Sequence, residues 1–400
     1  MSEATTPAAR VQVIDTLRAL ALYGVITMNL MAMVMGLIGA EIVPKAGPID
    51  YVFATFDLVL LQGKARSTFA LLFGVGFGML MVRAAQRGQA FTGFYLRRMS
   101  ALLLFGLINL AVLFWGDILI LYALLGMVLL LFRGWSNRAI LAAGLILVIG
   151  PPLALGLFEA ATGAPAPNLA GLTPEQAEGV MSASAPIYRA GDGLAYVRAN
   201  LAYYVDHHLT DTAYAFVYEL GVLGLFLLGL WTARTGVLAG VEAWRPFLRR
   251  VAWICLPVGL VLSALHASRR MGIDVEGAAY ALVSAAYVGL PIMAFGYVAI
   301  LALLLTRGGR FLQPLLSPMG RMALSGYLAS NAIGSFVWYG WGLGLMGRTN
   351  VTGMNLFALA VFGSLCVFSA VWLSVFRFGP VEWLWRCLSY ARWQPLLRRK

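Results

Sequence analysis

Long apolar segments separated by short polar loops dominate this chain of 400 residues. A helix that crosses the hydrocarbon core of a membrane needs about 20 predominantly apolar residues, and its backbone groups must be hydrogen-bonded within the helix. The pattern therefore predicts an all-α fold, a polytopic transmembrane helical bundle of about ten spans. The expected spans are residues 14–38, 66–83, 99–115, 118–132, 139–159, 214–232, 251–267, 280–306, 321–343 and 354–376.

Arginine clusters between these segments predict how the chain is oriented, because cytoplasmic loops carry an excess of Lys and Arg. The segment YVFATFDLVLLQG at 51–63 is short and amphipathic, which favours an interfacial or re-entrant helix over a full span. If 51–63 does not span, the clusters fall on one side. They are Arg83, Arg87, Arg97 and Arg98; Arg133 and Arg138; Arg234, Arg245, Arg249 and Arg250; Arg307, Arg310 and Arg321; and the basic residues of the tail.

Both termini are therefore expected in the cytoplasm. We interpret residues 1–400 as a single transmembrane domain, in which 160–213 is an extracytoplasmic loop and 377–400 is a cytoplasmic amphipathic tail. Arg269 and Arg270 are an exception, because this topology places them outside.

Composition supports the membrane class and excludes others. Hydrophobic residues make up 61% of the chain and charged residues 12%, with a mean hydropathy of +0.82, which no ordinary soluble domain shows. The net charge of +12 lies in short loops and gives no indication of a nucleic-acid partner. Three scattered cysteines, without paired histidines, indicate neither a disulfide framework nor a metal site.

Polar residues inside apolar helices are functional candidates, because lipid offers them no partner. In the first span Asp15 and Arg18 share a face, and Asn29 returns to that face about 16 Å further along the axis. The third span repeats the spacing with Arg98 and Asn109. Two interpretations stay open: amides that bond across a helix interface, or a polar pathway.

Asp117 follows Gly116 within a long apolar stretch. We expect a turn between two antiparallel spans there, with Asp117 at the start of the next helix. Lys64 and Arg66 fall on the side that the positive-inside rule disfavours. They either contact lipid headgroups or bind an anionic substrate or a carboxylate, and we expect one of them to pair with Asp117. The glycines at 74, 76 and 78 are typical of close helix packing and not of a phosphate loop.

His207 and His208 lie beside carboxylates just before a span. A histidine at a membrane mouth can act as a general base, although solvated or interfacial histidines are common.

Several ordered motifs give a family resemblance over nearly the whole chain. The chain resembles the YeiB-like family of bacterial membrane proteins in IDTLRALALYGVITMNL, GKARSTFALLFGVGFG, FYLRRMSALLLFGLINLAVLFWGDILILYALLG, PMGRMALSGYLASNAIGSFVWYGWGLGLMG and FGPVEWLWRCLSY. That family looks related to transmembrane acyltransferases, which include bacterial sugar O-acyltransferases and the lysosomal heparan-alpha-glucosaminide N-acetyltransferase. The resemblance implies location in the bacterial inner (cell) membrane.

Residue by residue, the resemblance suggests a donor site. Asp15 and Arg18 match the D-x-x-R of the first helix, and Arg97 with Arg98 match paired arginines that approach the phosphates of the acyl donor. The O-acyltransferases usually carry a histidine near the end of the first helix, where this chain has Asn29. Many YeiB-like proteins likewise have a histidine where Asn109 stands.

The resulting hypothesis is a membrane acyltransferase that moves an acyl group from a cytoplasmic acyl-CoA-like donor to an extracytoplasmic or lipid-linked acceptor. Acyl-CoA is then the donor substrate, without other cofactors or metal. Membrane lipids are the expected partners, and a homodimer is an option. The alternative is a transporter or channel for a small anionic or lipid-like solute. The expected roles are donor binding (Arg18, Arg97, Arg98), pathway lining (Asp15, Asn29, Asn109), the acceptor side (Lys64, Arg66) and catalysis (Asp117, His207, His208).

Overall fold

The computed structural model describes residues 7–38, 47–86, 88, 90–163, 185–205, 212–268 and 278–398, and within these ranges every regular element is helical. A lone antiparallel bridge joins Phe376 to Leu397. Eight helical stretches of the described residues are long and apolar enough to cross a membrane. The prediction of an all-α, multi-pass membrane protein is confirmed.

The long helices coincide with predicted spans. They are α1 (Pro7–Ile38), α3 (Lys64–Gln86), α4 (Phe91–Val112), α6 (Asn137–Thr162), α9 (Thr212–Thr235), α10 (Arg245–Ser268), α12 (Gly289–Leu305) with α11 (Ala278–Ala285) before it, and α15 (Val351–Val375). Two predicted spans form shorter helices, α5 (Leu119–Leu129) and α14 (Ala323–Trp338). Both short helices contribute residues to the site described below.

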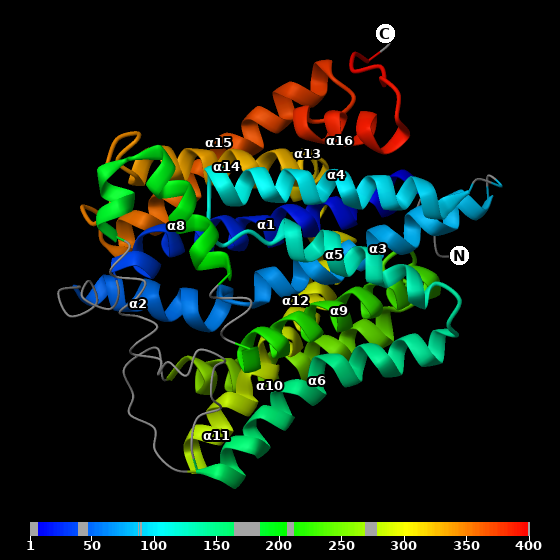
Figure 1. Ribbon diagram of the computed structural model, residues 1–400. Coiled ribbons are helices and arrows are strands. Elements are labelled where there is room, and N and C mark those ends of the chain that lie inside the picture. Colours follow the sequence, from blue (N-terminus) through cyan, green and yellow to red (C-terminus); the bar gives the residue numbers. More distant parts are fainter. Residues whose placement is uncertain are drawn as a thin grey trace.

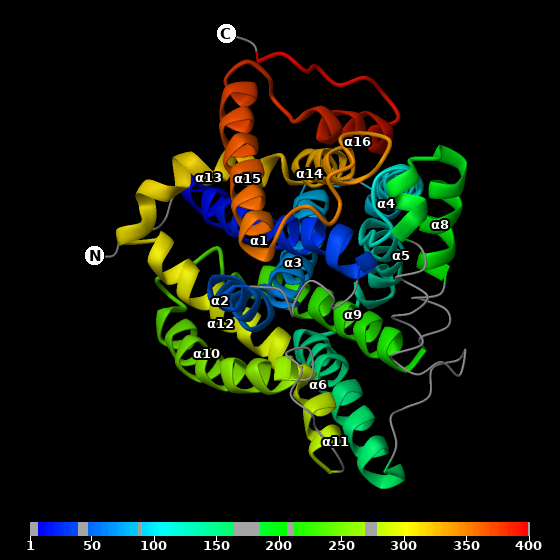
Figure 2. The ribbon, with the colours of Figure 1, turned by 90° about the vertical axis from the view of Figure 1, so that its left-hand side faces the viewer.

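Helix α1 lies in the middle of the molecule, between two groups of helices (Figure 1 and Figure 2). It packs against α3 on one side and against α13 (Gln313–Arg321), α14 and α15 on the other. Leu17, Leu22 and Ile26 on α1 are fully buried. An apolar helix that is buried all round belongs to the core of a bundle, so polar groups on α1 must find their partners inside the protein.

Residues 51–63 belong to a short helical stretch, α2 (Pro48–Phe56), which continues through a π-helical turn at Asp57–Leu61. The stretch ends at Gly63, whose φ of +75° is the left-handed conformation that glycine adopts without strain. Two buried carboxylates bond this stretch to α15. Asp50 accepts hydrogen bonds from the backbone N–H and the hydroxyl of Thr352, and Asp57 accepts one from the side-chain amide of Asn355.

The C-terminal helix α16 (Pro380–Tyr390) lies across α4 and the start of α14 (Figure 1). The Glu382 carboxylate accepts hydrogen bonds from the backbone N–H of Ser325 at 2.9 Å and from its hydroxyl at 2.5 Å. Burial raises the pKa of the Glu382 carboxyl. The amphipathic tail is therefore packed on the bundle through a buried polar contact.

Glycines allow α3 and α9 to approach closely, as the sequence predicts. A Cβ added at Gly74 would lie 2.1 Å from the carbonyl oxygen of Phe226, and one at Gly78 would lie 2.5 Å from Cβ of Ala233. The small-residue pattern thus determines how near the two backbones lie.

We expect Gly74→Ala to destabilise the protein by about 1–3 kcal/mol, the usual cost of overpacking, because the methyl group meets the α9 backbone. Gly221→Ala on α9 is the matched control, since its added Cβ meets nothing within 4 Å. Thermal unfolding in detergent, followed by circular dichroism, measures both variants. Equal melting temperatures for the two would show that the close contact is unimportant.

The predicted orientation can be tested by cysteine labelling in intact cells. In a background with Cys255, Cys366 and Cys387 changed to Ser, we expect Arg348→Cys to react with a membrane-impermeant maleimide added outside, and Ala90→Cys to react only after lysis. These positions precede α15 and α4 at opposite ends of the predicted spans. Labelling of residue 90 from outside would reverse the topology.

Candidate functional site

Residues 113–118 form the turn that the sequence predicts between α4 and α5. Asp117 lies in this turn, and its residue is only 3% exposed. Its Oδ1 accepts a hydrogen bond of 2.8 Å from the backbone N–H of Ile120, in the first turn of α5. The N-cap residue of α5 is Ile118, so Asp117 precedes the predicted cap position by one residue, but its carboxylate still satisfies one of the unpaired amides at the helix start.

The other oxygen of Asp117 ends a chain of hydrogen bonds across three helices. Asn29 on α1 donates from Nδ2 to Oδ1 of Asn331 on α14 at 3.1 Å. Asn331 donates to Oδ1 of Asn109 on α4 at 3.1 Å, and Asn109 donates to Oδ2 of Asp117 at 2.6 Å. All three amides donate toward the carboxylate, which is the orientation that stabilises its negative charge.

Helix periodicity explains why α14 completes this chain. Tyr327 and Asn331 are four residues apart and share one face of the helix. The hydroxyl oxygen of Tyr327 accepts the backbone N–H of Ile118 at 3.4 Å, so α14 contacts the turn at two levels. Asn109 and Asn331 are fully buried, whereas Asn29 is half-buried and forms the more accessible end of the chain.

Burial raises the pKa of the carboxyl group in the turn. Desolvation raises the pKa of Asp117 to about 7, although the hydrogen bonds from Ile120 and Asn109 act in the opposite direction. A group with such a pKa can accept and release a proton near neutral pH, which general acid–base catalysis requires.

The predicted pairing of Asp117 with Lys64 or Arg66 is wrong: among the described residues no ion pair joins them, and Lys64 and Arg66 bond to other groups. Lys64 is fully buried, and its Nζ donates to the carbonyl oxygen of Leu58 at 3.1 Å. This carbonyl belongs to the π-helical turn before α3. The Lys64 side chain thus bonds to the helical stretch that precedes α3.

Tyrosine rings, and not a carboxylate, surround Arg66. Its guanidinium lies 3.8 Å from the ring centroid of Tyr218 and donates to the hydroxyl of Tyr287 at 3.2 Å. The hydroxyl of Tyr122 donates to the carbonyl oxygen of Arg66. Tyr218 also interacts electrostatically with Asp117, so Arg66 and the carboxylate share a neighbourhood without forming an ion pair.

At the other end of α1 the structure gathers arginines around one carboxylate. Arg18 forms an ion pair with Asp15 at 3.0 Å, and Arg83 and Arg321 lie near enough to interact electrostatically with Asp15. Arg98 is electrostatically coupled to Arg18. An excess of positive charge therefore lies about 16 Å along α1 from Asn29.

Helix α16 holds the paired arginines of α4. The guanidinium of Arg98 stacks 3.4 Å from the ring centroid of Trp385, whose Nε1 donates to the carbonyl oxygen of Arg98. Arg97 is exposed, and its Nε donates to the carbonyl oxygen of Ser389. Of the predicted donor residues, Arg18 and Arg98 thus lie near each other.

Sequence reasoning missed Tyr327, Asn331 and Trp385. The i, i+4 spacing of polar residues in GYLASN would have indicated the first two. His207 and His208 lie outside the described residues. Within the described ranges, no three His, Cys, Asp or Glu side chains are grouped closely enough to hold a metal ion.

Comparison with known proteins gives the family of the chain. It is 32% identical to the protein YxaH of Bacillus subtilis over 407 aligned residues, which cover 98% of this chain and 96% of YxaH. The family model described as "Protein of unknown function (DUF418)" matches residues 232–392. The chain belongs to the DUF418 family.

Two further relatives match nearly the whole chain. A 39.9 kDa protein in the amylase 3′ region of Bacillus acidopullulyticus is 28% identical and covers 98% of this chain and 97% of its own length. YeiB of Escherichia coli is 28% identical over 96% of this chain and 98% of YeiB. The predicted resemblance to the YeiB-like family is confirmed.

We expect Asn331→Leu to destabilise this DUF418 protein by about 1–3 kcal/mol, because it leaves the buried Oδ1 of Asn109 without the N–H that donates to it. Ser335→Ala is the control on the same helix, since among the described residues that hydroxyl bonds only to Ala332 of its own helix. Thermal unfolding in detergent measures the difference. An unchanged midpoint for Asn331→Leu would show that the chain of amides contributes little to stability.

Proposed function

We propose that the protein is a membrane acyltransferase that takes an acyl group from a cytoplasmic acyl-CoA-like donor and delivers it to an extracytoplasmic or lipid-linked hydroxyl or amine. The hydrogen-bonded chain from Asn29 to the buried carboxylate of Asp117 carries the proposal. It ends on a group that can accept a proton, and α1 links it to an arginine cluster suited to a phosphorylated donor.

The reaction requires a base, a stabilised oxyanion and a site from which water is excluded. In the proposed step the acceptor oxygen attacks the thioester carbonyl, and its proton passes to the Asp117 carboxylate. The new C–O bond forms and the C–S bond breaks, and the proton then passes to the departing thiolate sulfur. The atoms balance without a further reactant.

The amides have a second role in this scheme. An Asn side chain cannot accept a proton at neutral pH, but its N–H groups can donate to an oxyanion. Asn29 uses one N–H on Asn331 and is half-buried, so its second N–H can face a reacting carbonyl. Asn29 then takes the place of a catalytic histidine by polarising the thioester, while Asp117 supplies the base.

The arginines at the opposite end of α1 support donor binding. Arg18 is already paired with Asp15, whereas Arg97 and Arg98 make only backbone and aromatic contacts among the described residues. Both can therefore exchange these contacts for phosphate oxygens, with which arginine forms bidentate bonds. Arg66, which contacts Tyr218 and Tyr287, is suited to bind an electron-rich acceptor.

The alternative function is transport of a small anionic solute along the same polar residues. It differs in its chemistry, because a transporter moves its solute and releases no thiol from an acyl-CoA. The buried carboxylate with three aligned donors favours acyl transfer, since a pathway needs polar groups open to solvent at both ends.

The donor site is tested by binding of acetyl-CoA to the purified protein. With Arg97→Gln and Arg98→Gln together, we expect the Kd to rise at least about tenfold, because each charge-assisted bond to phosphate is worth roughly 1.5–3 kcal/mol. Isothermal titration gives the Kd. The charge-conserving pair Arg97→Lys with Arg98→Lys is the comparison and should lose less affinity than the Gln pair, because it keeps the charge but not the bidentate bonds. Unchanged affinity in the Gln pair would remove the donor site.

The proposed base is tested by thiol release from acetyl-CoA in vesicles of bacterial lipid. We expect the rate to rise as the pH increases through about 7, the pKa of Asp117, because only the carboxylate accepts a proton. Asp117→Asn should lower the rate by about 10²–10⁴-fold, the usual contribution of a general base, at unchanged donor affinity. Asp192→Asn is the control, since Asp192 also bonds backbone amides at a helix start but is exposed. Equal rates for both variants would rule out Asp117 as the base.

A further inference from the structure

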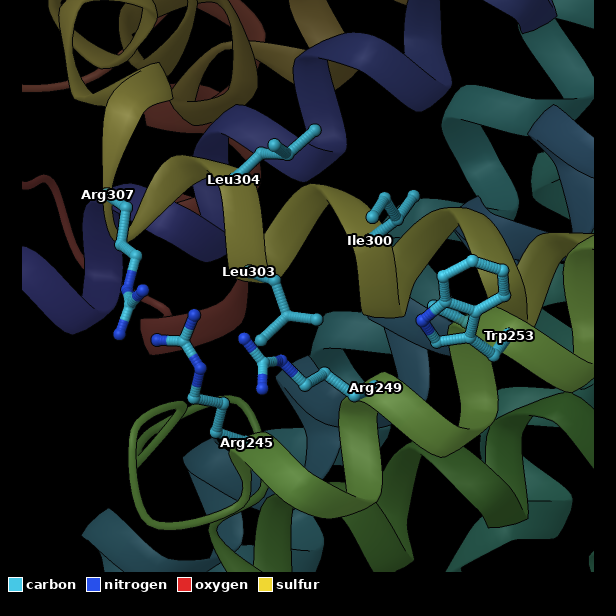
Figure 3. Close-up of a pocket in the computed structure, with 8 residues that line it drawn as sticks. Arg245, Arg249, Trp253, Ile300, Leu303, Leu304 and Arg307 are labelled. Carbon is cyan, nitrogen blue, oxygen red and sulfur yellow. The ribbon is translucent and has the colours of Figure 1, made fainter.

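A groove between α10 and α12 carries three arginines that the proposed chemistry does not use. Its volume is about 240 Å³. Figure 3 shows the guanidinium groups of Arg245, Arg249 and Arg307 pointing toward one another at one end of the groove, while Trp253, Ile300 and Leu303 form its wall. Charge is thus confined to one end and apolar surface to the rest.

The arginines exceed the negative charge available to them. Glu242 contacts Arg245 at 3.1 Å and Arg307 at 3.8 Å. Arg249 has no partner among the described residues, although it lines the same groove. One carboxylate therefore faces three guanidinium groups, and the groove keeps an excess of positive charge that favours an anion.

The position of the groove along the helices indicates what kind of anion fits. Arg245 and Arg249 lie at the start of α10, and Arg307 follows the end of α12 at Leu305. Both helical stretches are long and apolar enough to cross a membrane. The arginines therefore lie at the height of the lipid headgroups, and the apolar wall extends from them into the hydrocarbon.

The outer face of α10 is open to lipid. Trp253 is 82% exposed, and Ile254 and Val261 on the same helix are also exposed. Tryptophan at this depth is typical of the membrane interface. A soluble phosphate would contact only the charged end of the groove, whereas a molecule with both a phosphate and an acyl chain would contact the wall as well.

We infer that this groove binds an anionic phospholipid, such as phosphatidylglycerol or cardiolipin, with its phosphate among Arg245, Arg249 and Arg307 and an acyl chain along Trp253 and Leu303. Basic pockets between transmembrane helices recognise such headgroups. A zwitterionic lipid is disfavoured, because its ammonium group would bring a further positive charge beside Arg249.

Native mass spectrometry of the full-length protein, titrated with cardiolipin or phosphatidylethanolamine in detergent, tests the inference. We expect Arg249→Gln with Arg307→Gln to lower the fraction of cardiolipin-bound protein at least about fivefold and to leave phosphatidylethanolamine binding unchanged. Arg138→Gln with Arg392→Gln removes the same charge from two exposed arginines outside the groove and should leave cardiolipin binding intact. An equal loss in both pairs would reduce the effect to overall charge and overturn the inference.

A second variant separates the lipid from a free anion. Leu303→Trp keeps all three arginines but fills the apolar wall, so it should also lower cardiolipin binding, and inorganic pyrophosphate should not displace the lipid from the unaltered protein. Retained cardiolipin binding in Leu303→Trp, or displacement by pyrophosphate, would make the groove a site for small anions and overturn the inference.

Discussion

The burial of the Asp117 carboxyl group governs the arrangement of the helices around it. A carboxylate away from water is stable only if hydrogen-bond donors surround it, and otherwise it takes up a proton. Here Ile120 and Asn109 supply donors, Asn331 supports Asn109, and Asn29 supports Asn331. Helices α1, α4, α5 and α14 must therefore keep their register, since a shift of one residue on α14 would turn Asn331 away from both amides.

The buried basic side chains Lys64 and Arg66 are stabilised by contacts other than ion pairs. Lys64 donates to a carbonyl oxygen at a helix end, and Arg66 lies over Tyr218 and against Tyr287. Cation–π contacts and carbonyl acceptors compensate a desolvated charge without a carboxylate. Among the described residues Asp117 consequently has no neutralising ion pair, and burial keeps the pKa of its carboxyl group at about 7.

Three groups of arginines have different surroundings. The cluster around Asp15 lies at one end of the central helix, in line with the amide chain. Arg97 and Arg98 lie beside it under α16. The groove between α10 and α12 faces the lipid. Helix α16 joins α14 to α4, because Glu382 bonds to Ser325 on α14 while Trp385 stacks on Arg98. A substitution of Trp385 in the tail would therefore change the contacts of Arg98 in the proposed donor site.

The sequence by itself determined the helical class, the extent of the long helices, the turn before Asp117 and the close packing through Gly74, because hydropathy, helix period and residue size are local properties. It also indicated Asn29 and Asn109, since amides in apolar helices are costly wherever they lie.

Only the tertiary structure decided their partners. Asn331 follows Asn29 by 302 residues, and the spacing along one helix gives no information about which distant helix packs against it. The predicted pairing of Asp117 with Lys64 or Arg66 was wrong for the same reason. Opposite charges favour an ion pair, but the helix packing places Asn109 beside Asp117 and tyrosines beside Arg66.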